Sequence, residues 1–312
     1  MTTMKKAAAA TIGFFDGVHR GHLFLVEQLC REASVRGLRP VVITFDRHPR
    51  QVLCDSWQPQ LLTTLSEKEQ LLRQTGIDRL VVLHFDEELS LLSASDFMQH
   101  VLKEQLGVQM LLTGYDNHFG HRTKGTDEGF DDYVRYGQTM GIDVVEAKPL
   151  MLEGQAVSSS RIRRLLTQGE VEQAARCLGR PYELCGEVVE GEQVGRQIGF
   201  PTANLQLQSS CLLMPEDGVY AVRVSLMDDD RQRMGVTNIG MRPTFDGHRH
   251  TIETHILDFH RSIYRQPMTI RFVARLRSEQ HFDSAETLAR QMAADVQRAK
   301  EILQSQNPSL NS

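Results

Sequence analysis

Long apolar runs are missing from this sequence: none approaches the roughly 18 residues that a membrane-spanning helix requires. The first fifteen residues, MTTMKKAAAATIGFF, also lack the extended apolar core and the following cleavage pattern of a signal peptide. Cysteine is scarce, since the 5 cysteines are odd in number, widely spaced and never arranged as CxxC. That pattern argues against disulfides and a structural zinc site. We therefore expect a cytoplasmic protein that does not bind a membrane.

An excess of positive charge is missing as well. Lysine and arginine together number 35 against 40 aspartates and glutamates, and the net charge is -5. This balance gives no general attraction to nucleic acid, so we expect no nucleic-acid partner and only local anion sites. Internal repeats are also absent. With 312 residues and 40% hydrophobic content, the chain can form two globular domains, each with a core of its own. Its oligomeric state is not indicated.

The first half of the sequence alternates short β-rich runs with helix-like stretches. The runs span residues 7–14, 41–45, 80–85, 110–113 and 144–147. One helical pattern covers residues 23–33 and stops at Gly37, and another begins at Ser66, with Glu69 completing a capping box, and ends at Gly76. Repeated βα units predict a parallel sheet covered by helices, with ligands outside the carboxyl ends of the strands.

After about residue 180 the hydrophobic pattern changes to alternation. In MTIRFVARLR, one face is predicted to hold Met268, Ile270, Phe272, Ala274 and Leu276. VYAVRVSL and TIETHILDF read as further strands, which together predict a small antiparallel barrel or sandwich. A final helix is expected over residues 284–303, with an inward face made by Leu288, Met292, Val296 and Ala299. The domain boundary is predicted at residues 179–184, which gives domains 1–180 and 181–312.

The stretch GFFDGVHRGH, residues 13–22, falls where the first predicted strand passes into a helix. Glycine at such a corner permits close backbone approach to a ligand, and the free amides of the helix start favour an anion there. His19 and His22 flank Gly21 and can both donate to phosphate oxygens. Two alternatives stay open on the residues alone. Asp16 could cap the helix while the histidines face solvent, or Asp16 and the two histidines could bind a metal.

Two later stretches support the phosphate interpretation. VSSSRIRRLL places Ser158, Ser159 and Ser160 before a helix that carries arginines, although serines in that position are often only caps. Hydroxyls, helix-start amides and the guanidinium groups of Arg161, Arg163 and Arg164 would then converge on an anion. GYDNHFGHRTKG follows the fourth predicted strand and is too polar and glycine-rich for a core segment. We interpret it as a substrate loop.

In their order, GxFDGxHxGH, GYDxxFG and SSSRIR resemble the FMN adenylyltransferase half of the bacterial bifunctional riboflavin kinase/FAD synthetases. The resemblance implies a Rossmann-like nucleotidyltransferase fold of the HxGH type. It assigns ATP to Gly13, Phe14, Phe15, Asp16, Gly17, His19, Gly21, His22, Ser159, Ser160 and Arg163, of which His19, His22 and Arg163 would be catalytic. It assigns the flavin to Tyr115, Asp116, Asn117 and Phe119; Asn117 and His118 stand where the family more often has Phe and Arg.

A second candidate site begins in GEVVEGEQVGRQIGFPTANL. Thr202 and Asn204 lie two apart on an extended segment, so their side chains would point the same way and offer neutral oxygens to Mg²⁺. Glycines at 191, 195 and 199 would let backbone approach ATP phosphates, although such a stretch is also typical of an ordinary hairpin. Farther on, Glu253 and His255 share one face of a strand. Glu253 could accept a hydroxyl proton, or that face could simply be solvated.

GRxIGFPTANL, GVTNIGxRPTF and IETHILDF resemble the riboflavin kinase domain, a small antiparallel β-barrel. The resemblance implies Glu253 as general base and Thr202 and Asn204 as ligands of Mg²⁺ with ATP. It further assigns ATP to Gly191, Gly195, Arg196 and Gly199, and the flavin to Asn238, Arg242 and Arg277. Two departures from the usual family pattern are the spacing between Gly191 and Gly195 and the presence of Arg265 where glycine often follows the tyrosine.

The two resemblances together imply FAD synthesis in two steps. The second domain would phosphorylate riboflavin to FMN with ATP, and the first would adenylylate FMN to FAD with release of pyrophosphate. Two alternatives remain at this point. One is a chain with a single active site, such as another HxGH adenylyltransferase fused to a kinase. The other is a regulator that binds flavin or nucleotide without turnover.

Overall fold

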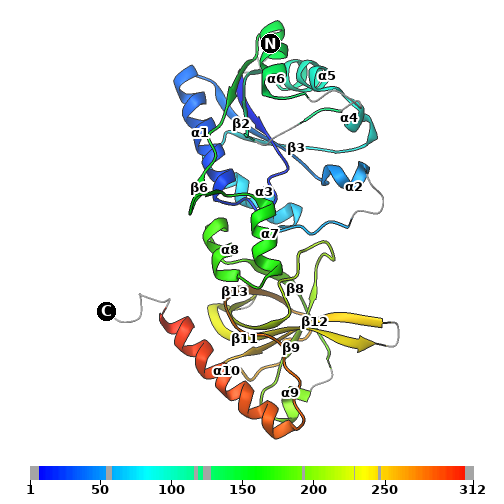
Figure 1. Ribbon diagram of the computed structural model, residues 1–312, viewed down its shortest axis with the longest axis vertical. Coiled ribbons are helices and arrows are strands. Elements are labelled where there is room, and N and C mark those ends of the chain that lie inside the picture. Colours follow the sequence, from blue (N-terminus) through cyan, green and yellow to red (C-terminus); the bar gives the residue numbers. More distant parts are fainter. Residues whose placement is uncertain are drawn as a thin grey trace. The chain divides into compact units, whose positions relative to one another are not determined.

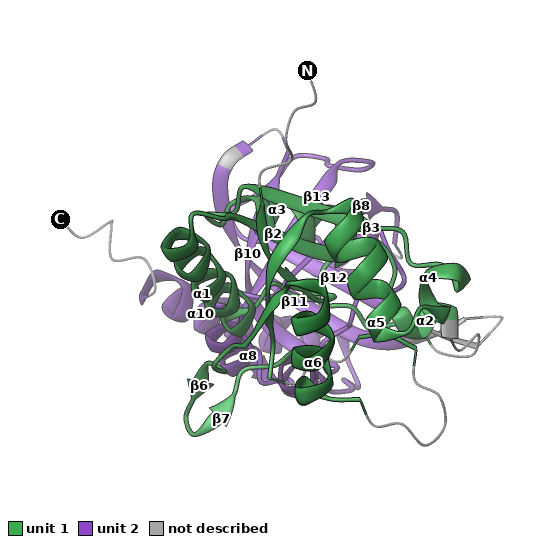
Figure 2. Cartoon of the chain, turned by 90° about the horizontal axis from the view of Figure 1, so that it is seen from above, with its two compact units in different colours: residues 1–159 green, residues 160–312 purple. Residues whose placement is uncertain are grey.

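The computed structural model describes residues 7–53, 58–115, 119–121, 128–191, 194–227, 229–244 and 247–305. The chain divides into two compact units, residues 1–159 and 160–312 (Figures 1 and 2). Helices α7 (Ser159–Thr167) and α8 (Val171–Leu178) therefore fall almost wholly in the second unit, whereas the sequence prediction drew the boundary near residue 180. Among the described helices, none has the length and apolar character needed to cross a membrane.

The first unit is built on a five-stranded parallel sheet in the order β3-β2-β1-β4-β5. The strands are β1 (Ala8–Ile12), β2 (Arg39–Phe45), β3 (Arg79–Leu83), β4 (Val108–Thr113) and β5 (Asp143–Glu146). Each overlaps a predicted run, and the parallel sheet is confirmed. Strand order reverses at β1, which has β2 on one side and β4 on the other. In such sheets the ligand crevice lies outside the carboxyl ends at this point.

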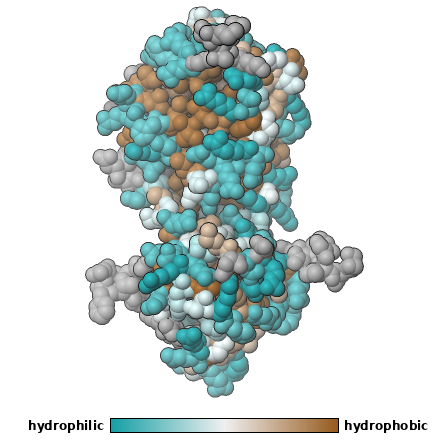
Figure 3. All heavy atoms as spheres, turned by 180° about the vertical axis from the view of Figure 1, so that it is seen from behind, coloured by the Kyte–Doolittle hydropathy of each residue, from teal (hydrophilic) through white to brown (hydrophobic). Residues whose placement is uncertain are grey.

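Helices cover both faces of this sheet. On one face, α1 (Arg20–Arg36) and α3 (Leu65–Arg73) pack on the sheet through Val26, Leu29 and Leu72. On the other, α5 (Ala94–Asp96), the π-helix η1 (Phe97–Gln105) and α6 (Phe130–Met140) contribute a second cluster of buried residues. Shorter elements are α2 (Pro49–Leu53), α4 (Glu87–Leu91), β6 (Met151–Leu152) and β7 (Gln155–Ala156). Apolar side chains gather on the face of this unit that Figure 3 shows.

Two helix boundaries test the predicted capping signals. Gly37 ends α1 in the left-handed conformation, φ 64°, as its position predicted. The capping box predicted at Ser66 and Glu69 is wrong, because the box is formed two residues earlier by Thr64 and Glu67. Glu67 N donates to Thr64 Oγ1 at 3.3 Å, and Thr64 N donates to Glu67 Oε2 at 2.7 Å. The extended backbone of Thr64 makes it the cap, while Ser66 is already helical.

The second unit contains a closed six-stranded barrel in the order β10-β11-β12-β9-β8-β13. Its strands are β8 (Glu183–Val189), β9 (Ala203–Leu207), β10 (Gly218–Leu226), β11 (Asp229–Thr244), β12 (Gly247–Ile256) and β13 (Pro267–Arg277). The short helix α9 (Val194–Gln197) and the terminal helix α10 (Ala285–Ser305) complete it. Of the two predicted architectures, the barrel is confirmed. Val296, Ala299 and Leu303 of α10 pack against its outer wall.

The alternation predicted along β13 holds only as far as Phe272. Phe272 is paired with Val222, but Ala274 is paired with Ala221, so the register skips Val273. Because directly paired residues share a face and neighbours in a strand do not, this bulge moves Ala274 to the opposite face from Phe272. Ala274 and Leu276 accordingly pack with α10, whereas the Phe272 ring meets Tyr182 and Tyr220. The prediction that all five apolar residues share one face is therefore wrong.

Candidate functional site

The turn after β1 has an unusual backbone. Phe15, Gly17 and Val18 all have positive φ, at 55°, 80° and 37°. Such a conformation is natural for glycine but costs energy at Phe15 and Val18, and it persists only where surrounding contacts enforce it. Here Gly13 N donates to Ile43 O at 3.1 Å, and Val18 N donates to Phe15 O at 3.1 Å. The turn is thus a rigid feature at the carboxyl end of β1, where the fold predicts a ligand.

Asp16 connects this turn to other segments through hydrogen bonds. It is 3% exposed, and its Oδ1 accepts hydrogen bonds from Leu62 N at 2.9 Å and Thr63 N at 3.3 Å. Gly17 N donates to Thr63 Oγ1 at 3.1 Å, and Ser159 Oγ donates to Asp16 O at 2.9 Å. The suggestion that Asp16 caps α1 is therefore wrong, because its carboxylate faces another loop. The metal alternative also fails, since the described residues contain no cluster of three or more His, Cys, Asp or Glu side chains able to hold a metal ion.

His19 and His22 lie together at the start of α1. His19 is the N-cap: its Nδ1 accepts a hydrogen bond from His22 N at 3.2 Å. Their rings stack with centroids 3.5 Å apart and planes 17° apart, and Phe15 meets the His22 ring edge-on. Because Nδ1 of His19 is an acceptor, the neutral ring carries its proton on Nε2. His19 can therefore donate from Nε2 to an anion at the start of α1, where the helix dipole also favours negative charge.

Gly21 explains the spacing of the two histidines. A Cβ at this position would lie 2.7 Å from Val157 O and 3.0 Å from the His19 ring. Val157 follows β7, so the backbone of a distant segment occupies the space that a side chain would need. Glycine is thus required here by proximity, and it allows the helix start, the stacked rings and residue 157 to pack together.

The remaining predicted residues of this site fall into three groups. Ser159 is joined to the turn through Asp16 O, while Ser160 and Arg163 follow it on α7 in the second unit. Asp116, Asn117 and His118 lie outside the described residues. Tyr115 is 45% exposed. Phe119 stacks on Tyr133 with centroids 4.3 Å apart, so one face of its ring is already covered by the core. Flavin binding in this segment stays a prediction.

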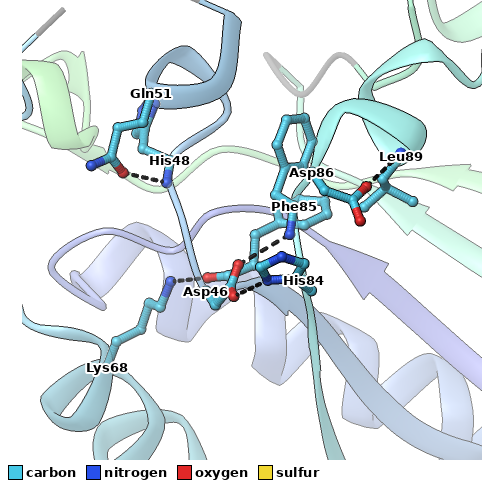
Figure 4. A network of polar contacts seen from close by, with 9 residues as sticks. Asp46, His48, Gln51, Lys68, His84, Phe85, Asp86 and Leu89 are labelled. Atoms are coloured by element: carbon cyan, nitrogen blue, oxygen red, sulfur yellow. Dashed lines mark hydrogen bonds and ion pairs between the residues drawn. The ribbon is translucent and has the colours of Figure 1, made fainter. Parts of the chain in front are cut away.

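Sequence-based prediction missed Lys68, a residue of α3 whose side chain extends toward the end of β2 (Figure 4). Its Nζ donates to Phe45 O at 2.7 Å and to Phe14 O at 3.1 Å. Burial lowers the pKa of Lys68 to about 8, against the opposing attraction of nearby carboxylates, Asp16 first among them. A lysine within a predicted helix is normally solvated, so nothing in the sequence pattern singled it out.

Asp46 lies beside Lys68 at the end of β2. Its Oδ2 is 2.6 Å from His84 Nδ1, and its Oδ1 accepts a hydrogen bond from Phe85 N at 3.0 Å (Figure 4). Burial opposes ionisation of Asp46, but the hydrogen bonds from His84 and Phe85 outweigh it and lower the pKa of Asp46. The carboxyl ends of β1, β2 and β3 are therefore tied together by a charged network.

In the second unit, the candidate residues form a row across the barrel wall. Asn204 is paired with Glu253, and Glu253 with Asn238, so these side chains share one face of β9, β12 and β11. Glu253 and Asn238 line a cavity of about 290 Å³, which we call the helix cavity because Leu288, Met292 and Val296 of α10 close it. The inward face predicted for the terminal helix is confirmed by this arrangement. Residues 279–282, which the sequence did not single out, complete its lining.

A second cavity, of about 350 Å³, lies beside residues 259–264, and we call it the loop cavity. Arg196 and Pro201 line it, together with Phe259, His260, Arg261, Ser262, Ile263 and Tyr264. Thr202 is the residue that lines both the helix cavity and the loop cavity. Thr202 therefore forms part of the wall of both cavities, and Asn204, two residues farther on, is paired with Glu253 of β12. The loop 259–264 was also missed, because its mixed composition matches no motif.

Two glycines of the predicted phosphate loop lie in close contacts, Gly191 with a side chain and Gly195 with backbone. A Cβ at Gly191 would lie 2.1 Å from Asn204 Nδ2, and one at Gly195 would lie 2.3 Å from Phe200 O. The side-chain amide of Asn204 therefore packs directly against the backbone of Gly191. Gly199 has φ 87°, which a side chain would rarely adopt. Neutral oxygens from Thr202 and Asn204 are ligands that suit Mg²⁺ when ATP phosphates supply the remaining charge, so the residues present fit the predicted metal.

The flavin residues predicted for this unit are placed differently from one another. Asn238 lines the helix cavity directly. Arg277 also lines it, but its guanidinium is engaged by Asp295 of α10, with Nε and Nη2 3.0 and 2.8 Å from Oδ2. Its charge is thus already compensated, and it forms part of the wall. Arg242 is on β11, opposite Arg249, and its side chain lies outside what the structure describes.

The fold and the two sites define an enzyme class: a parallel α/β unit with an HxGH helix start, joined to a barrel built for phosphate transfer. Comparison with known families agrees. The family model described as FAD synthetase matches residues 1–161, and the model described as riboflavin kinase matches residues 178–303. The chain belongs to the family of bifunctional riboflavin kinase/FMN adenylyltransferases.

Individual relatives cover nearly the whole chain. The bifunctional riboflavin kinase/FMN adenylyltransferase of Pseudomonas fluorescens is 38% identical over 95% of this chain and 93% of its own length. That of Escherichia coli K12 is 35% identical over 96% and 93%. A crystal structure from Streptococcus pneumoniae, described as a macrolide-efflux protein, has TM-score 0.84 and 29% identity over 95% of this chain and 97% of that one. The described fold is therefore shared along both units.

Proposed function

We propose that this chain makes FAD from riboflavin in two ATP-dependent steps. The second unit phosphorylates riboflavin to FMN, and the first unit adenylylates FMN to FAD with release of pyrophosphate. The observation that carries the first step is the position of Thr202 between two cavities, with Glu253 lining one of them. The two family models, each matching one of the units, support this division of the reactions. The spacing of the cysteines suits a reaction carried out in the cytoplasm.

In the kinase step, riboflavin occupies the helix cavity and ATP the loop cavity. The primary hydroxyl of the ribityl chain attacks the γ-phosphorus, the bond to the β,γ-bridging oxygen breaks, and ADP leaves. Glu253 accepts the hydroxyl proton, and Thr202 and Asn204 would hold Mg²⁺ with the nucleotide. The ion supplies neutralisation of phosphate charge as it develops. Most of the catalysis comes from positioning, because the two substrates meet at Thr202 with the base on the acceptor side.

In the adenylyl transfer, an FMN phosphate oxygen attacks the α-phosphorus of ATP, and the bond to pyrophosphate breaks. The nucleophile is already an anion, so no general base is required. The first unit instead supplies positive potential: the His19 Nε2 proton, the neighbouring His22 and the amide dipoles at the start of α1. Arg163 is assigned to the same phosphates on its sequence motif alone.

The test is an assay of the purified chain with riboflavin and Mg²⁺-ATP, in which FMN and FAD are followed separately by chromatography. We expect FMN to appear first and to be converted to FAD. A chain with one active site would stop at FMN, or would make FAD only when FMN is supplied. A regulator would bind flavin and ATP and yield neither product.

A further inference from the structure

Lys68 is a buried cation placed where the phosphate-binding turn leaves the sheet. It is 3% exposed, and its ammonium lies 3.9 Å from the centroid of the Phe14 ring. The two carbonyls that it binds belong to Phe45, the last residue of β2, and to Phe14, which follows β1. Thr44 Oγ1 also donates to Phe14 O, at 3.1 Å. One ammonium therefore joins the ends of two adjacent strands and covers the ring of a residue in the turn.

Charged and titratable groups surround Lys68 on every element that packs against it. Asp16 in the turn and Asp46 at the end of β2 attract it most, and Glu69 does so from its own helix. His48 meets the Phe14 ring edge-on with centroids 4.7 Å apart, and His84 is bound to Asp46. Two buried or half-buried carboxylates thus face one ammonium close to a site that must accept a polyanion. Without the ammonium, both carboxylates would repel ATP.

We propose that Lys68 is a positioning residue for adenylyl transfer: its ammonium fixes the Phe14 turn and offsets the charge of Asp16 and Asp46. The turn carries directly into His19 and the start of α1, so its geometry decides where these donors point. Lys68 acts through these groups, and its own donors are directed at carbonyl oxygens. The inference rests on the proposed function of the first unit.

A pH dependence follows from this arrangement. The pKa of Lys68 is lowered to about 8, so the ammonium is charged below that pH and neutral above it. Neutral Lys68 loses its attraction to the Phe14 ring and no longer offsets the two carboxylates. FMN adenylylation should therefore fall as the pH rises through about 8. Riboflavin phosphorylation takes place in the second unit, to which Lys68 does not belong, and it serves as an internal control because it uses the same Mg²⁺-ATP.

The experiment measures kcat/KM for ATP in both reactions of the full chain at several pH values on both sides of 8. Lys68→Met removes the charge at similar length, and Lys68→Arg keeps it. Arg73→Met is the matched control, since Arg73 is an exposed cation on the same helix, where it forms an ion pair with Glu69 at 3.1 Å. Binding of ATP and thermal unfolding of each variant are measured in parallel.

We expect wild type and Arg73→Met to lose adenylylation with a midpoint near pH 8. At pH values below 8, Lys68→Met should lower kcat/KM for adenylylation about 10- to 100-fold, because a charged hydrogen-bond donor is lost. The remaining adenylylation should depend little on pH. Lys68→Arg should move the midpoint upward. An unchanged profile in a folded Lys68 variant would overturn the proposal, and so would a wild-type profile with no alkaline loss relative to the kinase. Wild type that makes no FAD from FMN at any pH would instead contradict the proposed function.

Discussion

Gly21 shows how a single residue type can be demanded by its surroundings. Its backbone is helical and unstrained, yet the carbonyl oxygen of Val157 and the ring of His19 occupy the place of a Cβ. Gly37 presents the opposite case: it has φ 64° but no atom within 4 Å of a Cβ. Gly21, within α1, therefore tests the effect of steric crowding, and Gly37, at the end of α1, tests the effect of a left-handed backbone.

We predict that Gly21→Ala nearly abolishes FMN adenylylation, because the histidines and residue 157 must move apart. Overpacking of this kind costs about 1–3 kcal/mol of stability. Gly37→Ala should cost about 1 kcal/mol through its left-handed backbone but leave the reaction intact. Chemical unfolding and the FMN-to-FAD assay measure both effects. Equal activity in the two variants would contradict the role given to Gly21.

Lys68 also has a consequence for stability, opposite in sign to its consequence for activity. Its folded pKa of about 8 lies below the usual 10.5, so between these values the unfolded chain binds the extra proton. Stability of the first unit therefore rises with pH in this window, by a total of about 3 kcal/mol from this group. Comparing the pH dependence of the free energy of unfolding in wild type and Lys68→Met isolates the contribution of Lys68. A difference that is flat from pH 8 to 10.5 would show that burial does not lower the pKa of Lys68.

At the scale of elements, the salt bridge between Arg277 and Asp295 holds α10 over the helix cavity. Both side chains are largely buried, at 17% and 7% exposed, and three nitrogen–oxygen contacts of 2.8–3.1 Å join them. Glu286 and Arg290, on the same helix, form a pair that is 84% and 73% exposed. These pairs differ mainly in solvent access, so they allow a controlled comparison.

We predict that Asp295→Ala destabilises the second unit by about 3–5 kcal/mol, because it leaves a buried guanidinium uncompensated. It should also raise the KM for riboflavin, since α10 closes the cavity that we assign to the flavin. Glu286→Ala should change stability by less than about 1 kcal/mol. Thermal unfolding and steady-state kinase assays report the two quantities. A stable Asp295→Ala variant with an unchanged KM would contradict the assigned position of riboflavin.

The type of each element could be predicted where one sequence pattern dominated. The prediction failed where two patterns were equally possible. Strands β1 and β2 of the first unit, for example, are buried along all or most of their length, which is typical of the middle of a parallel sheet. By contrast, Thr64 and Ser66 both precede a glutamate by three residues, and only the extended backbone of Thr64 decides which one caps α3. The bulge at Val273 has no sequence signal either, because valine fits a regular strand equally well. Lys68 was missed for a related reason, since the carbonyls that bind it come from distant segments.

At the scale of the whole molecule, the chain is two compact units whose chemistry was recognisable from separate motifs. Motif order predicted candidate site residues in the HxGH helix start, at Glu253 and at the Thr202–Asn204 pair. The cavities could not be predicted, because residues 259–264 and 279–282 enter them only through the barrel's connections. Apart from Ser160 and Arg163, the residues assigned to each site lie in one unit, so a change in one site should leave the reaction at the other site active.

The central claim is that one chain carries two separable reactions, and crossing two variants with two substrates tests it most directly. Glu253→Gln removes the proposed base. His19→Asn with His22→Ala removes the ring donors while asparagine preserves the helix cap. We predict that Glu253→Gln slows riboflavin phosphorylation about 10²- to 10⁴-fold and still makes FAD from supplied FMN. The histidine variant should make FMN from riboflavin and no FAD. Loss of both reactions in either folded variant would contradict the account.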